Sequence, residues 1–199
     1  MSEPAGRSAV APRGGPQEQG DDSVDRALVA RWLAGDERAA TLLVERHAPA
    51  LARFAASLTS GMDRGQVDEL VQDTLVRAFQ SIAEFRGEST LRTWLFTIER
   101  RLLLDRRRAA RRRPDSEVIA EDDAATEYTA LDAMVAGETE DRIRQAIVRL
   151  SPLQRDVFML RVSEGLSYKE IAGVVGTTEG AARVHYHNAV RTIKELVDA

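Results

Sequence analysis

The stretch LSYKEIAGVVGTTEGAARVHYHNAVRTI, residues 166–193, decides the fold because it places two short helices on either side of a glycine. Ser167 and Glu170 have the spacing of a capping box, which begins a helix by pairing its free backbone N–H groups. Gly176 then stands where the first helix must turn. The pattern predicts a helix-turn-helix, the motif whose second helix enters the major groove of DNA.

The second helix of this motif is predicted to begin at Thr177 or Thr178, since either hydroxyl can cap it. Its apolar residues recur at i, i+4, i+7 and i+11, so they form one buried stripe. The members of the stripe are Ala182, Tyr186, Ala189 and Ile193. An ordinary amphipathic helical hairpin is the alternative interpretation, and the rest of the chain decides between the two.

The composition predicts an all-α fold. Runs that alternate apolar and polar residues with a period of two are nearly absent, and only 5% of the residues are aromatic, as in compact helical proteins. The chain has no cysteine, which excludes disulfides, thiolate metal sites and a cysteine nucleophile. No run of apolar residues is long enough to cross a membrane, and the N-terminus lacks the apolar core of a signal peptide. We therefore expect a soluble cytoplasmic protein without membrane insertion.

The 199 residues are predicted to form two small helical domains joined by a flexible acidic linker. Pro49 falls inside an amphipathic stretch that Asp36 caps, and it is expected to kink or divide that helix. Ser151 and Pro152 are predicted to open a later helix as its N-cap and first residue. The expected segments are a disordered tail at 1–22, a first domain at 23–112, a linker at 113–138 and a second domain at 139–199.

Charge is distributed unevenly around the expected linker. Residues 100–113 contain eight arginines and one acid, Asp105, whereas residues 115–141 contain ten acids and no Lys or Arg. A solvated helix end favoured by the helix dipole would explain two arginines, but not eight. We therefore expect the arginines to lie along one exposed helix edge and to contact a phosphate backbone.

No set of catalytic residues emerges from the sequence. Phosphate-binding loops, zinc-protease motifs and nucleophile elbows are all missing. His185 and His187 are two residues apart on a helix and therefore point about 200° apart, which is unsuited to one shared metal ion. The chain is predicted to be neither an enzyme nor a binder of a metal or cofactor.

Three blocks in series resemble the extracytoplasmic-function (ECF) sigma factors of bacterial RNA polymerase. They are DELVQDTLVRAF (68–79), FRGESTLRTWLFTIERRLLLDRRR (85–108) and LSPLQRDVFMLRVSEGLSYKEIAGVVGTTEGAARVHYHNAVRTIKEL (150–196). The resemblance implies sigma regions 2 and 4, which bind core polymerase and read the minus-10 and minus-35 promoter elements to direct initiation and open the start site. It also implies contacts with the β′ clamp helices and β flap of the polymerase, and with an anti-sigma factor.

The resemblance assigns roles to three sets of residues. The set expected to bind core polymerase comprises Asp68, Glu69, Gln72, Asp73 and Arg77. The set expected at the minus-10 element, where an extruded base is captured, comprises Phe85, Arg86, Gly87, Glu88, Ser89, Thr90, Leu91, Trp94, Thr97, Arg100, Arg101 and Arg106. The set expected at the minus-35 duplex comprises Ser167, Lys169, Thr177, Thr178, Glu179, Ala181, Arg183, Val184, His187 and Arg191.

Two other functions remain open at this point. A stand-alone DNA-binding regulator would use residues 140–197 alone and would usually dimerise on symmetric half-sites. A protein-interaction module that has lost DNA binding would need neither Arg183 nor the arginine cluster. Transcription from a set of promoters, with purified core polymerase and with or without this protein, separates these functions.

Overall fold

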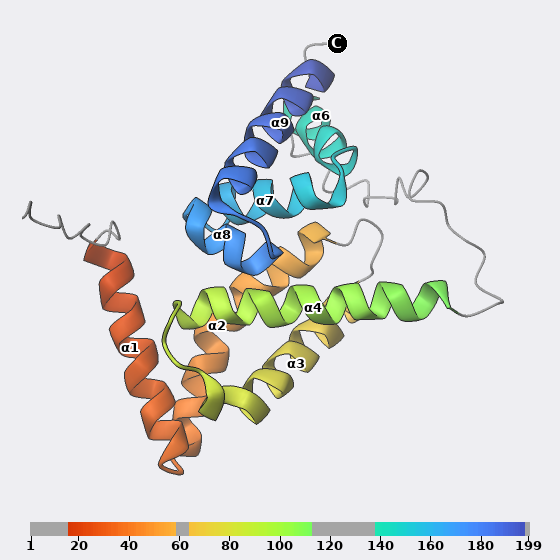
Figure 1. The fold of residues 1–199 in the computed structure, drawn as a ribbon. Helices are drawn as coiled ribbons and strands as arrows, with labels where there is room; N and C mark the ends of the chain where they lie inside the picture. Colours follow the sequence, from red (N-terminus) through yellow and green to blue (C-terminus); the bar gives the residue numbers. More distant parts are fainter. Residues whose placement is uncertain (1–15, 59–63, 113–137, 198–199) are drawn as a thin grey trace, which may run out of the picture.

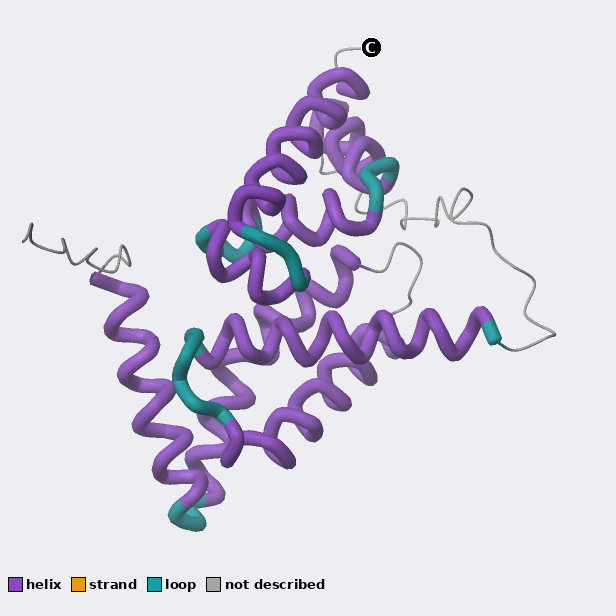
Figure 2. The backbone as a smooth tube through the Cα atoms, in the orientation of Figure 1, coloured by secondary structure: helices purple, strands orange, loops and turns teal. Residues whose placement is uncertain are grey.

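The structure is a computed structural model that describes residues 16–58, 64–112 and 138–197. These residues form helices and connecting loops without a strand, as the sequence predicts (Figures 1 and 2). The helices are α1 (Pro16–Leu33), α2 (Glu37–Leu58), α3 (Arg64–Ser81), the short 3₁₀ helix η1 (Ile82–Glu84), α4 (Leu91–Arg111), α6 (Glu138–Val148), α7 (Pro152–Val162), α8 (Tyr168–Val175) and α9 (Glu179–Val197).

Helix α1 begins earlier than the sequence analysis expected. The predicted disordered tail extended to residue 22, but the helix already begins at Pro16, where the fixed φ of proline suits a first helical position. Asp22 pairs with Arg26 within the helix, and Asp21 lies 2.5 Å from the guanidinium of Arg46 on α2. The ion pair between Asp21 and Arg46 joins the start of α1 to α2. Residues 1–15 lie outside the described part of the chain.

The sequence analysis expected Pro49 to kink or divide its helix, and the structure excludes the division, because α2 runs without interruption through this proline. Pro49 is exposed, and the carbonyl that loses its helical partner there can be solvated. The predicted N-cap is confirmed, because Asp36 Oδ1 accepts a hydrogen bond from the backbone N–H of Arg38 at 3.0 Å. The buried face of α2 includes Leu43, Leu51 and Phe54.

Helices α6 to α9 form a second group with well-defined helix ends. Ser151 and Gln154 make a complete capping box at the start of α7, with Pro152 as the first helical residue, as predicted. The Arg155 guanidinium donates to the carbonyls of Ile147 and Leu150, at 3.1 and 3.4 Å. It thereby satisfies backbone groups that the end of α6 leaves without helical partners.

The two groups of helices share one hydrophobic core, a contact that the sequence analysis did not predict. Helices α7 and α8 lie against α2 and α4 (Figure 1). Phe54 and Leu103 from the first group belong to the same buried cluster as Val157, Leu160 and Ile171 from the second. The apolar surface of α8 is therefore covered by α4 as well as by α7 and α9.

Helix α4 accordingly carries two buried faces. One includes the buried Leu91 and Leu95, with Trp94, Ile98 and Leu102 half-buried beside them. The structure also buries Thr93, Phe96, Glu99 and Leu103. Phe96 packs edge-on against Phe54 of α2, with ring centroids 5.1 Å apart. Along this face the polar residues Thr93 and Glu99 alternate with the apolar Phe96 and Leu103, so the hydrophobic periodicity of the sequence does not reveal it.

Glu99 is an acidic residue in a fully buried position. Its side chain is fully buried, and neither carboxylate oxygen has a hydrogen-bond partner among the described residues. Burial, assisted by the nearby carboxylate of Glu164, raises the pKa of Glu99 from 4.5 to about 9. Glu99 is therefore protonated and neutral at pH 7 in this conformation.

We predict that Glu99→Gln flattens the pH dependence of stability. Because the pKa of Glu99 rises on folding, its contribution to stability is complete below pH 4.5 and is lost as the pH rises toward about 9. One such proton changes the free energy of unfolding by at most about 1.4 kcal/mol per pH unit. Urea unfolding at several pH values between 6 and 9 should show this slope in the wild type and a smaller one in Glu99→Gln. The exposed substitution Glu195→Gln is the control, and equal slopes in all three proteins would contradict the assignment.

Candidate nucleic-acid interface

The helix-turn-helix forms as the sequence predicted. Ser167 Oγ accepts the backbone N–H of Glu170 at 3.3 Å, and the Glu170 carboxylate accepts the backbone N–H of Ser167 at 2.9 Å. Gly176 ends α8 with a φ of +73°, a conformation that glycine adopts without strain. Thr178, rather than Thr177, caps α9, because its hydroxyl accepts the N–H of Ala181 at 3.2 Å. The end of α8 and the start of α9 are therefore fixed by local hydrogen bonds and by the turn at Gly176.

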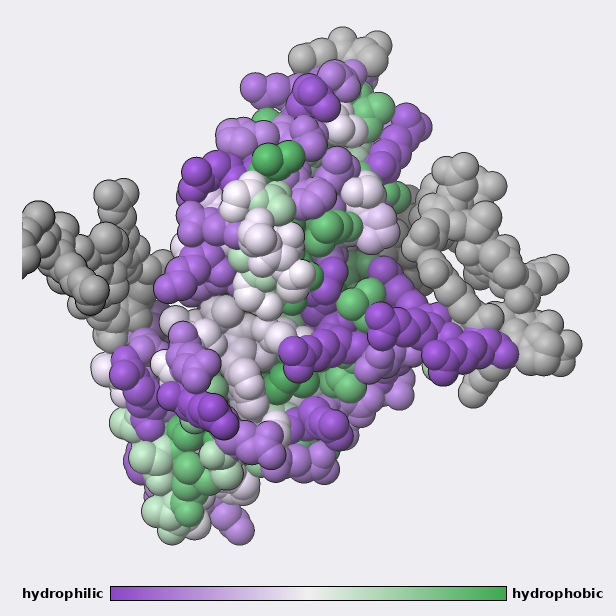
Figure 3. Space-filling view, in the orientation of Figure 1, coloured by the Kyte–Doolittle hydropathy of each residue, from purple (hydrophilic) through white to green (hydrophobic). Residues whose placement is uncertain are grey.

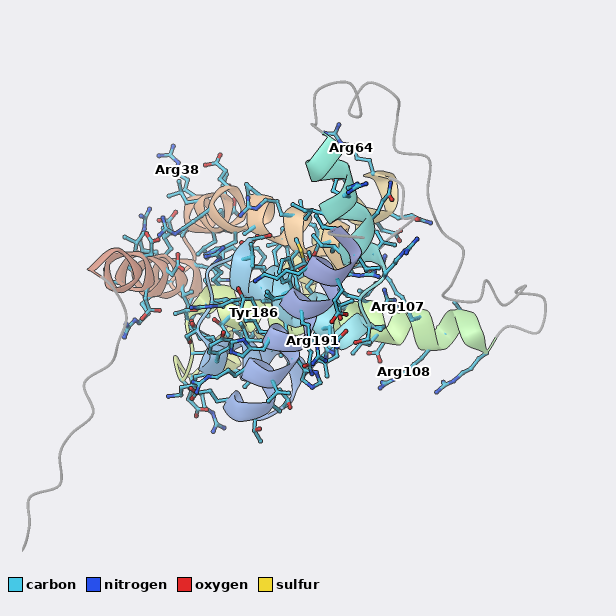
Figure 4. The ribbon with its side chains drawn as sticks, turned by 90° about the horizontal axis from the view of Figure 1, so that it is seen from above. Arg38, Arg64, Arg107, Arg108, Tyr186 and Arg191 are labelled. Carbon is cyan, nitrogen blue, oxygen red and sulfur yellow. The ribbon has the colours of Figure 1, made fainter. Side chains whose placement is uncertain are left out.

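The apolar stripe of α9 anchors the helix and determines which side chains it presents. Ala182, Ala189 and Ile193 are buried. Tyr186 lies between the rings of Phe158 and Tyr168, with centroids 6.1 and 5.9 Å away. The opposite face is exposed and contains Thr178, Glu179, Arg183, Val184, His187 and Arg191. Figure 4 shows Tyr186 and Arg191 on this helix, seen from above.

Arg183 is held in place by two neighbours. Its guanidinium lies 3.1 Å from the carboxylate of Glu179, one turn earlier, and 5.2 Å from the ring centroid of Tyr168 on α8. Arg161 approaches the same ring at 5.0 Å. Both arginines make cation–π contacts that the sequence analysis missed, because nothing in the sequence indicated that Tyr168 lies beside them.

The remaining residues of the expected duplex-binding set lie around the same motif. Lys169 is exposed on α8, whereas Thr177 and Ala181 are half-buried in and after the turn. Ser167 is exposed, but its hydroxyl is engaged in the cap of α8. All residues of the expected duplex-binding set therefore lie in or next to the helix-turn-helix. The exposed side chains of the set belong mainly to α9.

The loop between η1 and α4 brings two aromatic rings together. Phe85 and Trp94 have centroids 5.3 Å apart, and Gly87 turns the chain with a φ of +70°. Arg86, Gly87 and Glu88 are exposed, while Ser89 and Thr90 are half-buried. These residues form a small surface patch that consists of two aromatic rings bordered by polar side chains.

The N-cap of α4 is Thr90, because Thr90 Oγ1 accepts the backbone N–H of Thr93 at 3.2 Å. One expectation for this loop needs correction. Leu91 was expected at the surface of a base-binding pocket, but it is only 2% exposed and belongs to the core. Thr97 is half-buried, and its hydroxyl donates to the carbonyl of Thr93. The surface available to a ligand is therefore narrower than the sequence suggested.

The arginines of α4 do not all lie along one exposed edge, contrary to the expectation. The Arg100 guanidinium is largely buried and donates to Asp156 Oδ2 at 2.7 Å. Arg106 contacts Asp73 at 2.5 Å, and Arg107 donates to the carbonyl of Leu58 at 2.6 Å. These contacts form because successive helical positions point in different directions, toward α7, α3 and α2 in turn.

Arg101 and Arg108 remain exposed on the same helix. Arg108 points away from the helical core in Figure 4 and makes a local ion pair with Asp105. Hydrophilic side chains dominate the far end of α4 in the view of Figure 3. The exposed basic surface of α4 is thus real but smaller than the count of arginines implied.

Helix α3 presents a polar face beside an apolar groove. All five residues expected to bind polymerase are exposed: Asp68, Glu69, Gln72, Asp73 and Arg77. Asp73 and Glu69 also lie near Arg106, at 2.5 and 3.6 Å. Asp68 and Gln72 stand at the rim of a groove between α2 and α3. Its apolar walls, which the sequence analysis did not identify, are Val44, Ala48, Pro49, Ala52, Val71, Leu75, Val76 and Phe79.

The described residues contain no cluster of three or more His, Asp or Glu side chains with the geometry of a metal site. None of the described helices is long and apolar enough to span a bilayer.

Comparison with known proteins places both helical groups in defined families. Residues 43–113 match Sigma-70 region 2, and residues 140–193 match Sigma-70, region 4. The ECF RNA polymerase sigma-E factor of Haemophilus influenzae is 32% identical over 182 residues, which cover 87% of this chain and 95% of that protein. The structure of CnrH in complex with the cytosolic domain of CnrY superposes with a TM-score of 0.67 at 28% identity, over 88% of this chain and 97% of CnrH.

A second solved structure, the sigma factor RpoE of Bartonella quintana in complex with the anti-sigma factor NepR, has a TM-score of 0.60 at 26% identity. It covers 80% of this chain and 96% of that one. Both superpositions extend across most of the chain and therefore include both groups of helices.

We predict that Arg183→Ala weakens binding to minus-35 duplexes and relaxes base preference at one position. A bidentate pair between arginine and guanine contributes about 1–3 kcal/mol of discrimination. Affinities should be measured against a library of single-base variants of the minus-35 site. His187→Ala, one turn further along the exposed face, is the matched comparison and should have the smaller effect. An equal loss on every duplex in the Arg183→Ala protein would restrict Arg183 to phosphate contact.

Proposed function

Because the chain belongs to the ECF sigma factors of RNA polymerase, we propose that its exposed faces divide promoter recognition and polymerase binding among three helices. As a sigma factor it serves promoter recognition in transcription initiation. Below, region 2 denotes residues 43–113 and region 4 denotes residues 140–193. The observation that carries the proposal is the capped helix-turn-helix of region 4 with the exposed face of α9.

In this proposal α9 reads the minus-35 element. The N-terminal half of a recognition helix contacts base edges, and its flanks contact phosphates. Glu179, Arg183 and His187 occupy the first half of the exposed face, while Arg191 lies further along. Arg183 is suited to base contact because its neighbours Glu179 and Tyr168 limit the conformations of a long side chain.

The loop before α4 and the exposed side of that helix bind the minus-10 element. Extrusion of a base from the duplex costs a few kcal/mol, which stacking and hydrogen bonds in a pocket must offset. Phe85 and Trp94 supply the aromatic surface, and Arg86 and Glu88 supply polar groups at its edge. Arg101 and Arg108 are placed to contact the phosphates of the melted strand.

Helix α3 binds the core polymerase. Its exposed acids and the adjacent apolar groove offer both charge and hydrophobic area to the β′ clamp helices. Region 4 would meet the β flap while α9 holds DNA. The proposal leaves RNA synthesis to the polymerase and assigns this chain no catalytic group. It also places the protein in the cytoplasm with the polymerase, under the control of an anti-sigma factor.

Transcription in vitro tests the proposed function. Core polymerase alone should ignore a set of candidate promoters, and addition of this protein should start transcription at those with matching minus-10 and minus-35 elements. Binding of symmetric duplexes without stimulation of core polymerase would favour a stand-alone regulator. Inhibition of polymerase without DNA binding would favour an interaction module. Either result would contradict the proposal.

We predict that Gln72→Arg weakens binding to core polymerase several-fold, and that Asp68→Arg combined with it weakens binding further. Both side chains stand at the rim of the groove and away from the buried stripe, so helix content measured by circular dichroism should not change. Gln80→Arg is the control, because it adds the same charge at another exposed position of the same helix. Equal affinities of the Gln72→Arg and Gln80→Arg proteins for core enzyme would remove the assigned role of this face.

A further inference from the structure

The exposed face of α9 has an apolar residue at its centre. Successive residues of a helix are about 100° apart, so Val184 lies about 170° from the middle of the apolar stripe of α9. Arg183 lies only about 90° from the middle of that stripe, at the edge of the exposed face. Val184 is 57% exposed. Among the exposed residues of α9 that the structure describes, it is the one with a hydrocarbon side chain.

The neighbours of Val184 contact other groups at the sides of the face. The guanidinium of Arg183 lies 5.2 Å from the ring centroid of Tyr168 on α8. The ring of His187 lies 5.9 Å from the ring of Tyr186, in an edge-on arrangement. These contacts draw the two polar side chains away from the centre of the face. Val184 therefore stands uncovered between them.

The surface around Val184 allows another molecule to approach closely. One turn earlier the helix carries Gly180, where an added Cβ would meet no atom within 4 Å. The side chain of valine holds largely one rotamer in a helix, so Val184 loses little conformational entropy when another surface packs on it. Valine is also a poorer helix former than alanine or leucine. Helix stability therefore does not account for valine at this position.

We propose that Val184 recognises a thymine of the minus-35 element by packing against its C5-methyl group. The inference rests on the proposed function, because it takes α9 to lie in the major groove with its exposed face toward the bases. The major-groove edges of the base pairs carry hydrogen-bond donors and acceptors, together with the methyl group of thymine. Val184 can neither donate nor accept a hydrogen bond from its side chain, so the methyl group is the partner that suits it.

Arg183 and Val184 together then define a part of the promoter element. Successive residues of a helix differ by about 1.5 Å along its axis, which is less than the rise of about 3.4 Å per base pair. The two side chains therefore contact the same base pair or neighbouring ones. Arginine favours guanine and an apolar side chain favours thymine. We expect the recognised minus-35 element to place a thymine beside the guanine that Arg183 contacts.

Deoxyuridine tests the contact because it differs from thymidine only in lacking the C5-methyl group. The holoenzyme is formed from core polymerase and the full chain, and deoxyuridine replaces one thymidine of the minus-35 element at a time, on either strand. Affinity for the promoter duplex should fall about fourfold at one position, the effect of one buried methyl group. Equal affinity at every position, or a minus-35 element without thymine, would overturn the proposal.

The variant Val184→Ala separates this contact from effects of the methyl group on the duplex itself. Its holoenzyme should bind the thymidine and deoxyuridine duplexes equally, because alanine does not reach the methyl group. Val162→Ala is the matched control, since Val162 is 56% exposed at the end of α7 and lies outside the expected duplex-binding set. It should keep the fourfold difference. A difference that persists in the Val184→Ala holoenzyme would overturn the role of Val184.

A second substitution restores the methyl group on another base. Replacement of the critical T·A pair by C·G should lower the affinity of the wild-type holoenzyme, and 5-methylcytosine at that position should recover part of the loss. The recovery should be absent in the Val184→Ala holoenzyme and present in the Val162→Ala control. Equal recovery in the Val184→Ala and wild-type proteins would contradict the methyl contact.

Failure of this inference differs from failure of the proposed function. A holoenzyme that starts promoter-dependent transcription but binds thymidine and deoxyuridine duplexes equally leaves the proposed function intact and overturns the role of Val184. The same result is expected if Val184 packs against a protein partner instead of DNA. A chain that does not start transcription with core polymerase overturns the proposed function, and the inference fails with it.

Discussion

Helix α4 packs against α3 on one side and against α8 on another, and the arrangement of the whole molecule follows from this double burial. The first face includes Leu91 and Leu95, and the second includes Phe96 and Leu103. A helix with two buried faces keeps only a narrow strip in contact with solvent. Residues that would bind DNA must therefore lie on that strip or at an interface that opens.

The same constraint explains why the arginines of α4 have different surroundings. Arg100 points toward region 4 and is paired with Asp156, whereas Arg101 is exposed one position later. Arg106 and Arg107 reach acceptors on α3 and at the end of α2. Buried charges must be paired, because an unpaired one costs several kcal/mol in desolvation. The number of arginines in a segment therefore overstates the basic surface that a nucleic acid meets.

Local features of the fold were predictable from the sequence, and contacts between distant segments were not. The capping boxes at Ser151 and Ser167 and the turn at Gly176 depend on residues within a few positions of one another, so their spacing reveals them. The pairing of Arg100 with Asp156 joins residues 56 positions apart, and no periodicity in the sequence indicates it. Leu91 was misassigned to a surface pocket for a related reason, since a shift of one residue at the start of a helix moves a side chain from the surface to the core.

The contact between the two regions leaves some residues of the candidate site exposed and covers others. The face of α9 is free in this conformation, whereas Arg92, Thr93 and Arg100 on α4 are engaged by region 4. The two proposed DNA-binding surfaces are therefore unequally available in the same molecule. A duplex can meet α9 without any change in the fold, but a strand that needs Arg100 must first displace Asp156.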